Sequence, residues 1–97
     1  MESTHVIFRK WHNGEIIALF PYEPGTMDPW TCQSYEHIGQ HGAASVSLTS
    51  AYTRTTKPEE YVELKRELER IGYNLIVLKR LPANSVNVRR AKLAQVA

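Results

Sequence analysis

The N-terminal part of the chain shows two apolar runs separated by a turn signal. Residues 5–11 place β-branched and aromatic side chains on both sides of a predicted strand. The triplet at 12–14 is His-Asn-Gly, and Asn-Gly favours a tight turn between strands. Residues 16–20 are apolar on both faces, which is typical of a central strand. The pattern therefore predicts a β-hairpin over residues 5–20, with its second arm inside the sheet.

The segment after the hairpin carries loop and strand signals in turn. Three prolines and a glycine in residues 21–30 predict a loop, because proline has no backbone N–H to donate. Residues 31–37 alternate in polarity and predict a third strand, which ends where Gly39 and Gly42 follow. Residues 43–52 are small and hydroxylated, and their short alternation fits either an edge strand or an irregular connection.

Several helix signals coincide in residues 56–72. Thr56 and Glu59 have the spacing of a capping box, and Pro58 suits the first helical turn. Gly72 is a typical C-terminal cap. One apolar stripe follows helical spacing and consists of Tyr61, Leu64, Leu68 and Ile71. The sequence therefore predicts an amphipathic helix.

The C-terminal part combines one strand signal with a basic tail. Residues 73–81 are apolar on both faces as far as Pro82, and they predict an internal strand. Residues 83–97 form a basic C-terminal tail that is either disordered or a short helix capped by Ser85. The basic residues at this end of the chain include Arg80, Arg89, Arg90 and Lys92. We expect this tail to be solvated.

Together these elements predict an α+β fold with an antiparallel sheet of about four strands and one helix packed on one face. The hairpin, the third strand and the strand after the helix form this sheet in a single domain at residues 1–82. The other face would stay open. Small domains tend to bury an open sheet face or an unpaired edge against a second copy, so a homodimer is predicted.

Composition narrows the class of protein. The chain has 97 residues, of which 42% are hydrophobic and 23% charged, and this composition is typical of one folded domain and excludes a disordered chain. The single cysteine cannot form an internal disulfide and the N-terminus lacks a secretory pattern, so we expect a cytoplasmic location. No apolar stretch approaches the roughly 20 residues that span a bilayer, which argues against a membrane partner.

The densest polar chemistry lies in residues 34–42, with the sequence Ser-Tyr-Glu-His-Ile-Gly-Gln-His-Gly. The side chains of this segment that can bind a ligand are Tyr35, Glu36, His37, Gln40 and His41. Gly39 and Gly42 would offer free amides as a backbone nest for an anion. We therefore predict a small accessory protein that binds a macromolecular partner or a small polar or phosphate-bearing ligand through residues 35–42.

Two other functions stay open. A histidine-dependent enzyme could use His37 or His41 as general acid or base on a phosphate-containing substrate. Its nucleophile is not evident, because a lone thiol such as Cys32 in an apolar strand is typical of a small buried side chain. A weak nucleic-acid binder could use the basic tail, although a net charge of +2 is too small to indicate such a partner alone.

The two histidines have the His-x-x-x-His spacing of metal ligands on a helix. Gly39 between them and Gly42 after them argue against a helix, so the spacing alone does not bring the rings together. We therefore predict no metal site and no cofactor.

Residues 34–42 also contribute to a resemblance that covers residues 5–81. The other segments that carry it are residues 6–10, 16–21, 58–61 and 71–75. With these segments the chain resembles a family of short proteins from gut bacteria and their phages or mobile elements, for which no activity is established. The resemblance implies a phage or mobile-element setting and adds weight to the His-Gly segment. The tail after residue 82 lies outside it.

Overall fold

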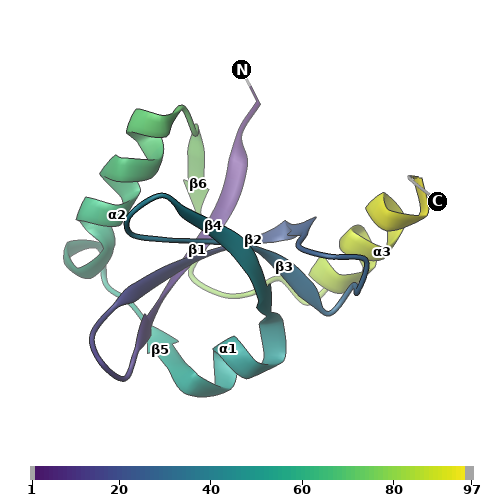
Figure 1. Cartoon of the computed structure of the whole chain (residues 1–97), viewed down its shortest axis with the longest axis horizontal. Coiled ribbons are helices and arrows are strands. Elements are labelled where there is room, and N and C mark those ends of the chain that lie inside the picture. Colours follow the sequence, from purple (N-terminus) through teal and green to yellow (C-terminus); the bar gives the residue numbers. More distant parts are fainter. Residues whose placement is uncertain (1, 96–97) are drawn as a thin grey trace.

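The computed structural model describes residues 2–95 of the chain. Within these residues the chain forms six strands and three helices in an α+β arrangement, as the sequence predicts for the fold class (Figure 1). The elements in chain order are β1 (Thr4–Trp11), β2 (Ile16–Pro24), β3 (Thr31–Glu36), β4 (Gln40–Ser45), α1 (Val46–Tyr52), β5 (Thr53–Thr55), α2 (Pro58–Ile71), β6 (Leu75–Val77) and α3 (Ser85–Gln95). Residues 1, 96 and 97, which belong to the predicted domain and tail, lie outside the described residues.

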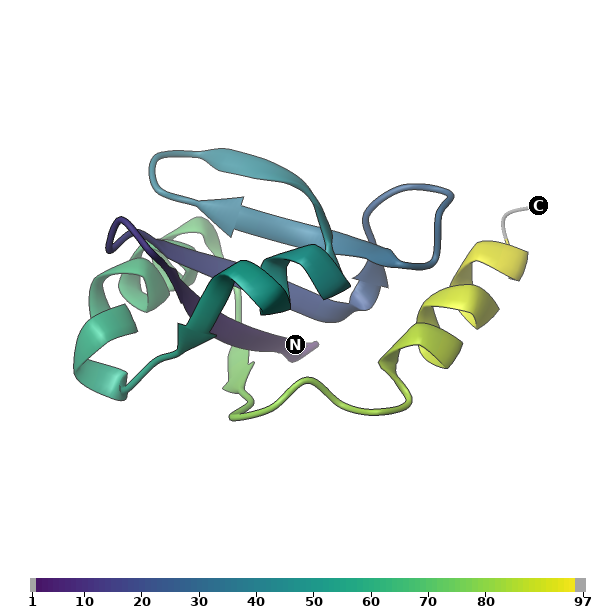
Figure 2. The same cartoon turned by 90° about the horizontal axis from the view of Figure 1, so that it is seen from below.

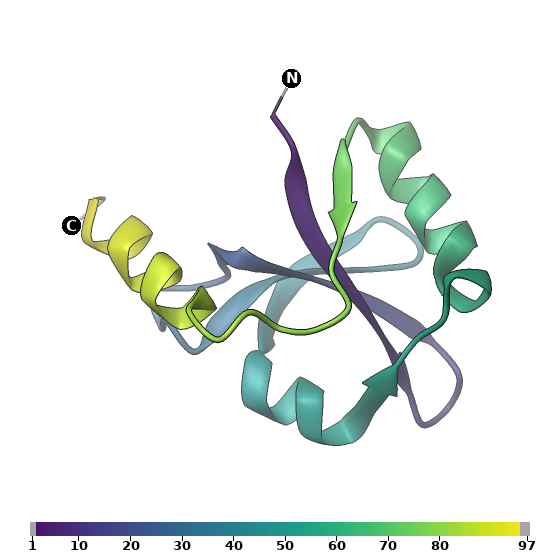
Figure 3. The same ribbon diagram turned by 180° about the vertical axis from the view of Figure 1, so that it is seen from behind.

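The sheet has more strands than the sequence indicates. Its order is β4-β3-β2-β1-β5 with antiparallel neighbours, and β6 pairs in parallel with the beginning of β1. The two short strands β5 and β6 share the outer side of β1, because β5 pairs with Arg9–Trp11 and β6 with Thr4–Val6. The predicted internal strand at 73–81 is therefore wrong: only Leu75–Val77 is a strand, and it lies at an edge beside β1 (Figure 3).

The predicted hairpin is confirmed, with a different turn. β1 and β2 pair up to Lys10 opposite Ile16, and four residues separate the two strands. The Trp11 N–H donates to the Glu15 carbonyl at 2.8 Å and closes a loop of three residues, 12–14. Only Gly14 has a positive φ, of 93°, and its N–H donates to the Trp11 carbonyl at 2.9 Å. A three-residue loop that ends in a left-handed glycine needs one positive φ, whereas the two-residue Asn-Gly turn needs two.

Apolar side chains cover both faces of the sheet. On the α2 face the buried residues are Val6, Phe8, Ala18, Phe20, Tyr35, Leu64 and Leu68. On the opposite face they are Ile7, Ile17, Leu19 and Cys32, and Val46 of α1 and Leu81 pack on them. The predicted open face is therefore wrong, because α1 and the segment after β6 cover it. That segment crosses behind the sheet toward α3 (Figure 3).

The predicted helix at 56–72 is confirmed as α2, and its cap lies one residue later than predicted. The Glu60 carboxylate accepts from the Lys57 N–H at 3.0 Å, so Lys57 is the N-cap. The Thr56 hydroxyl instead donates to the Phe8 carbonyl at 2.9 Å and ties the helix start to β1. Gly72 ends the helix with φ 126°, and its N–H reaches the carbonyl groups of the last turn.

Two segments differ from their predicted structure. The predicted loop at 21–30 is too long, because β2 continues to Pro24 across a register shift, where proline is tolerated in a sheet. The predicted edge strand at 43–52 is a strand only as far as Ser45. From there α1 begins, since the Ser45 hydroxyl accepts from the Leu48 N–H and caps a helix.

The predicted tail contains a helix that packs against β2 and the loop after it (Figure 2). Arg89 of α3 is 1% exposed, so the expectation of a solvated tail is wrong for this residue. Its Nε donates to the Pro29 carbonyl at 2.7 Å and its Nη1 to the Pro21 carbonyl at 2.6 Å. Burial lowers the pKa of this guanidinium.

Two further basic side chains of α3 have partners. Lys92 forms an ion pair with Glu23, and the Arg90 guanidinium lies 5.1 Å from the centre of the Trp30 ring. Two positive charges of the tail therefore interact with groups of the domain itself, one with a carboxylate and one with an aromatic ring. Each helix within residues 2–95 is too short or too polar to cross a lipid bilayer.

Candidate functional site

The β3–β4 hairpin carries the predicted site residues at the end of the sheet beside α2. Tyr35 and Glu36 end β3, and Gln40 begins β4 after a short turn. Tyr35 pairs with His41 across the hairpin, so these two side chains share one face of the sheet. The structure therefore brings Tyr35 and His41 together, with ring centres 4.6 Å apart in an edge-to-face contact.

A carboxylate from α2 fixes the turn of this hairpin. Glu67 accepts the Tyr35 hydroxyl on one oxygen, and its other oxygen bonds to Nδ1 of His37. The Gly39 N–H in turn donates to the Tyr35 hydroxyl oxygen at 2.9 Å. Tyr35 is 1% exposed, whereas His37 is largely in solvent. We call this set of Tyr35, His37, Gly39 and Glu67 the Glu67 clasp.

The clasp changes the acid–base properties of its members. The hydrogen bond from Tyr35, followed by the one from His37, lowers the pKa of the Glu67 carboxyl. Burial, followed by the hydrogen bond to Glu67, raises the pKa of the Tyr35 hydroxyl. Glu67 is therefore an anion and Tyr35 a neutral donor at neutral pH, which is the pairing that the hydrogen bond requires.

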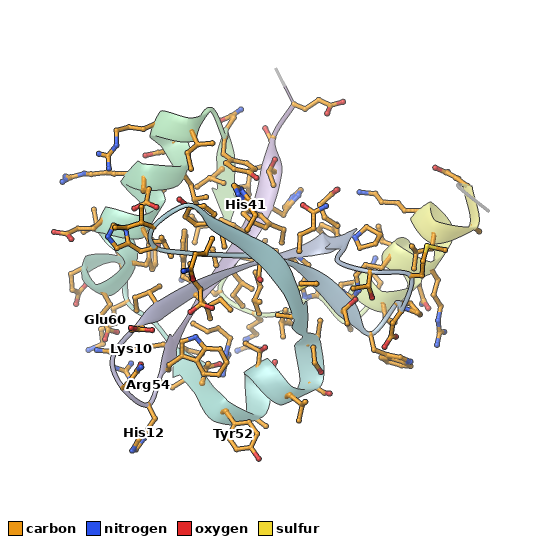
Figure 4. The ribbon with its side chains drawn as sticks, viewed as in Figure 1. Lys10, His12, His41, Tyr52, Arg54 and Glu60 are labelled. Carbon is orange, nitrogen blue, oxygen red and sulfur yellow. The ribbon has the colours of Figure 1, made fainter. Side chains whose placement is uncertain are left out.

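His41 belongs to a second set of contacts. Its Nε2 lies 3.1 Å from the Tyr73 hydroxyl oxygen, and Tyr73 stacks on the buried Phe20 ring with centres 5.2 Å apart. Figure 4 shows His41 beside the upper end of α2, far from the tip of the β1–β2 hairpin. His37 and His41 thus have different partners, Glu67 and Tyr73, and the structure does not join the two imidazoles in one catalytic pair.

The two glycines of the predicted nest have structural roles. The amide of Gly39 is already donated to Tyr35. Gly42 lies within β4 opposite Ser34. Gln40 and Glu36 face each other at the end of the hairpin, where Gln40 is exposed. The part of the predicted site that is open to a partner is therefore the exposed strand β4 rather than the turn.

Sequence reasoning did not identify Glu67 and Tyr73. Glu67 lies three residues after Leu64 and one before Leu68, so it falls beside the buried stripe of α2. A carboxylate next to an apolar stripe is a usable signal, because such a group needs a partner. Ile71, which the stripe did include, is 51% exposed.

The surface between α2 and the β1–β2 turn is acidic. A groove of about 670 Å³ there is lined by the carboxylates of Glu15, Glu36, Glu59, Glu60, Glu63 and Glu67, and by two arginines, Arg66 and Arg70. Carboxylates outnumber cations on this surface, which disfavours a phosphate-bearing ligand at the His37 side of the hairpin.

The Cys32 thiol and a metal site are the two remaining candidates for chemistry. Burial raises the pKa of the Cys32 thiol to about 11, so this side chain is protonated at neutral pH and is a poor nucleophile. Among the residues that the structure describes, no three His, Cys, Asp or Glu side chains gather in a way that would hold a metal ion.

A second ion-pair cluster ties β1, β5 and α2 together. Glu60 bonds to Lys10 Nζ at 3.0 Å and to Arg54 Nη2 at 2.7 Å (Figure 4). The Arg54 hydrogen bond, then the Lys10 hydrogen bond, lower the pKa of Glu60 from 4.5 to about 2. This cluster positions the start of α2 against the sheet.

The two lowered carboxyl pKa values predict how stability depends on pH. A carboxyl group with a depressed pKa in the folded state stabilises the fold above its unfolded pKa, and this contribution disappears as the pH falls through the folded pKa. The stabilisation by Glu60 and Glu67 should therefore be present above the ordinary carboxyl pKa and be lost as the pH falls and the two groups become protonated, toward pH 2 for Glu60. Thermal melts of the parent chain and of Glu60→Gln and Glu67→Gln would show this. The differences between parent and variants should shrink over the same interval, and equal differences at every pH would contradict the assignment.

Comparison of the sequence with protein families and with curated proteins, and of the structure with solved structures, finds no match.

Proposed function

We propose that this chain is a small cytoplasmic accessory protein that binds an extended segment of a partner protein along the outer edge of β4. The observation that carries the proposal is that, within residues 2–95, β4 pairs with β3 alone and its other edge is unpaired. This strand contains Gln40, His41 and Gly42 of the predicted binding segment. The resemblance to short proteins of gut bacteria, phages or mobile elements stays a prediction about its setting.

The outer edge of β4 has the chemistry of a strand acceptor. In an antiparallel ladder, the N–H and C=O groups of alternate residues point away from the existing partner and are free to bind a new strand. Proteins usually protect such an edge with lysine, proline or a bulge. The sequence of β4 is Gln-His-Gly-Ala-Ala-Ser, which has neither charge nor proline. An added strand would therefore meet small side chains and an accessible backbone.

The hairpin that presents this edge is held in place on the α2 face. The Glu67 clasp fixes its turn, and the Tyr73 hydroxyl holds His41 of β4. A strand that is ordered before the partner arrives loses less conformational entropy on binding. The clasp therefore favours binding without contacting the partner.

Apolar side chains flank β4 at both ends. Ile38 is 74% exposed in the turn before β4, and Leu48 is 60% exposed in the helix after it. Exposed apolar side chains at the ends of a paired segment can anchor the side chains of a bound peptide. They favour a protein segment as the partner over a small polar ligand.

The two alternative functions have less support. A histidine-dependent enzyme would need a nucleophile and a base in one place, whereas His37 and His41 have separate partners and Cys32 is buried. A nucleic-acid binder would need a free basic tail, but Arg89 is buried and Lys92 is paired with Glu23. The buried, unpaired thiol of Cys32 agrees with a reducing compartment.

A charge placed on the edge tests the proposal. Gly42 accepts a side chain, since a Cβ at this position would meet only the Ser34 hydroxyl, at 3.5 Å. Peptides selected from a random displayed library should bind the parent chain and slow hydrogen exchange of the β4 amides. Gly42→Lys should weaken their binding at least about tenfold, because a lysine on an edge strand opposes pairing.

The matched control is His12→Lys, which adds the same charge at the exposed β1–β2 turn (Figure 4). It should bind the peptides as the parent chain does. Peptides that protect other amides, or that bind Gly42→Lys normally, would refute the β4 site.

Sedimentation of the parent chain at high micromolar concentration also tests the predicted homodimer. An 11 kDa species would leave the edge free for a partner, and a dimer that Gly42→Lys disrupts would assign the edge to a second copy.

A further inference from the structure

The first two strands of the sheet separate beyond their hairpin. β1 and β2 pair from Lys10 opposite Ile16 to Ile7 opposite Leu19. Beyond that point the beginning of β1 pairs with β6, while β2 continues toward α3. In Figures 1 and 3 the N-terminal half of β1 and the helix α3 therefore lie on two sides of a wedge.

Side chains leave a cleft of about 630 Å³ in this wedge. It lies on the opposite side of the domain from the acidic groove beside the β1–β2 turn, which has a different lining. The residues that give the cleft its chemistry are His5, Tyr22, Gln33, Tyr73, Asn84 and Lys92. His5, Tyr22 and Gln33 come from β1, β2 and β3. Tyr73 precedes β6, Asn84 precedes α3, and Lys92 lies in α3.

The walls of the cleft offer aromatic surface in fixed positions. Tyr22 is half-buried and contacts His5 edge to face, with ring centres 5.1 Å apart. Tyr73 is held by stacking on Phe20 and by its contact with His41. Rings that are already ordered can stack on a planar ligand at little entropic cost.

The same walls carry polar groups with spare hydrogen-bonding capacity. Gln33 and Asn84 are exposed and Tyr22 is half-buried, and the side-chain amides of the first two and the hydroxyl of the third are polar groups of the cleft lining. An amide side chain offers a donor and an acceptor together, which matches the paired donor and acceptor on the edge of an adenine ring.

Carboxylates outnumber ammonium groups in the cleft. Its one lysine, Lys92, is paired with Glu23, and Glu2 is a second carboxylate in the lining. This arrangement leaves no free cation for a phosphate group among the residues that line the cleft. A ligand that suits the site is therefore planar, hydrogen-bonding and uncharged.

We propose that this cleft binds a free purine nucleoside, with the base between the aromatic walls and its edge at the Gln33 and Asn84 amides. The site is separate from the β4 edge and does not depend on the function proposed for it. Either one can fail without the other.

Adenosine is the probe that tests the cleft. Titration of the isotope-labelled chain should give saturable amide shifts that centre on Tyr22, Gln33 and Asn84, with millimolar or tighter affinity. Tyr22→Ala should weaken binding at least about fivefold, because one base–aromatic contact is removed. Adenosine monophosphate should bind no more tightly than adenosine, since Lys92 is already paired.

Two variants serve as controls. Tyr52→Ala removes a tyrosine that is 69% exposed on α1, outside the cleft, and it should bind adenosine as the parent chain does. Tyr22→Phe keeps the ring and should retain most of the affinity. The proposal is overturned if adenosine produces no saturable shifts, if Tyr22→Ala and Tyr52→Ala behave alike while both stay folded, or if the monophosphate binds tenfold more tightly than adenosine.

Discussion

Replacement of Arg89 by alanine is expected to lower the free energy of unfolding by about 3 kcal/mol. Arg89 is fully buried between α3 and β2, and its two hydrogen bonds satisfy the carbonyl groups of Pro21 and Pro29. Its loss would leave both carbonyls without these donors and a cavity in place of the long side chain. Since domains of this size are stable by only about 5–15 kcal/mol, the effect is a large share of the total. Urea unfolding followed by tryptophan fluorescence measures it.

The neighbouring arginine provides the control for this experiment. Arg90 is exposed and its guanidinium lies over the Trp30 ring, so Arg90→Ala should change stability by about 0.5–1 kcal/mol. Arg89→Met should fall between parent and Arg89→Ala, because methionine fills volume but donates no hydrogen bond. If Arg89→Ala were no more destabilising than Arg90→Ala, α3 would not be held to the sheet as described.

Replacement of Glu67 by alanine is expected to cost about 2 kcal/mol of stability and to loosen the β3–β4 hairpin. The variant leaves the buried Tyr35 hydroxyl without its acceptor and frees His37. Hydrogen exchange of the β4 amides should become faster even under conditions where the rest of the sheet stays protected. The combination of a moderate loss in global stability and a local loss of protection identifies the clasp.

Tyr35→Phe separates the contribution of the hydroxyl from that of the ring. In a double-mutant cycle, Glu67→Ala and Tyr35→Phe should be less harmful together than the sum of the two, because they remove the same hydrogen bond. Lys65 and Glu69 form an exposed ion pair on the same helix, so Glu69→Ala is the matched control and should have an effect below about 0.5 kcal/mol. Strictly additive effects of Glu67→Ala and Tyr35→Phe would show that the two side chains do not interact.

The parts of the fold that could be predicted are those with strong local signals. The β1–β2 hairpin follows from two apolar runs around one Asn-Gly pair, and α2 follows from its stripe and from Gly72. The prediction of an edge strand or an irregular connection at 43–52 missed the helix α1, because the small residues of this segment carry no strong local signal. In the structure the Ser45 hydroxyl caps the first turn of α1, and this contact favours a helix after residue 45. Local propensity is weak in such segments, and tertiary packing overrides it.

The arrangement of β6 depends on long-range geometry and carries no local signal. An apolar run such as Leu75–Val77 can be an internal or an edge strand, and the choice depends on where α2 returns the chain. The packing of α3 also depends on long-range geometry and carries no local signal. The burial of Arg89 depends on two carbonyl acceptors, Pro21 in β2 and Pro29 in the loop after it, and composition does not show that the fold brings them to α3.

The candidate site remains a prediction, and the structure shows only how its segment folds. Polar groups and glycines are dense in residues 34–42, and these residues form the turn of the β3–β4 hairpin and the parts of the two strands next to it. Because spacing along a strand does not show which partner each side chain meets, the roles of His37 and His41 could not be separated. Their partners, Glu67 and Tyr73, lie about thirty residues further along the chain and reach the hairpin only through the fold.

The divided outer side of β1 has a consequence for how the chain folds during synthesis. β2 follows within a few residues and can pair at once, whereas β5 and β6 are made more than forty residues later. Until Thr55 has left the ribosome, both halves of the outer edge of β1 lack their native partners, and the half at Thr4–Val6 stays unpaired until Val77 has emerged. The nascent protein therefore passes through a stage at which an apolar strand is open to wrong pairing, and shielding by a chaperone would have its largest benefit there.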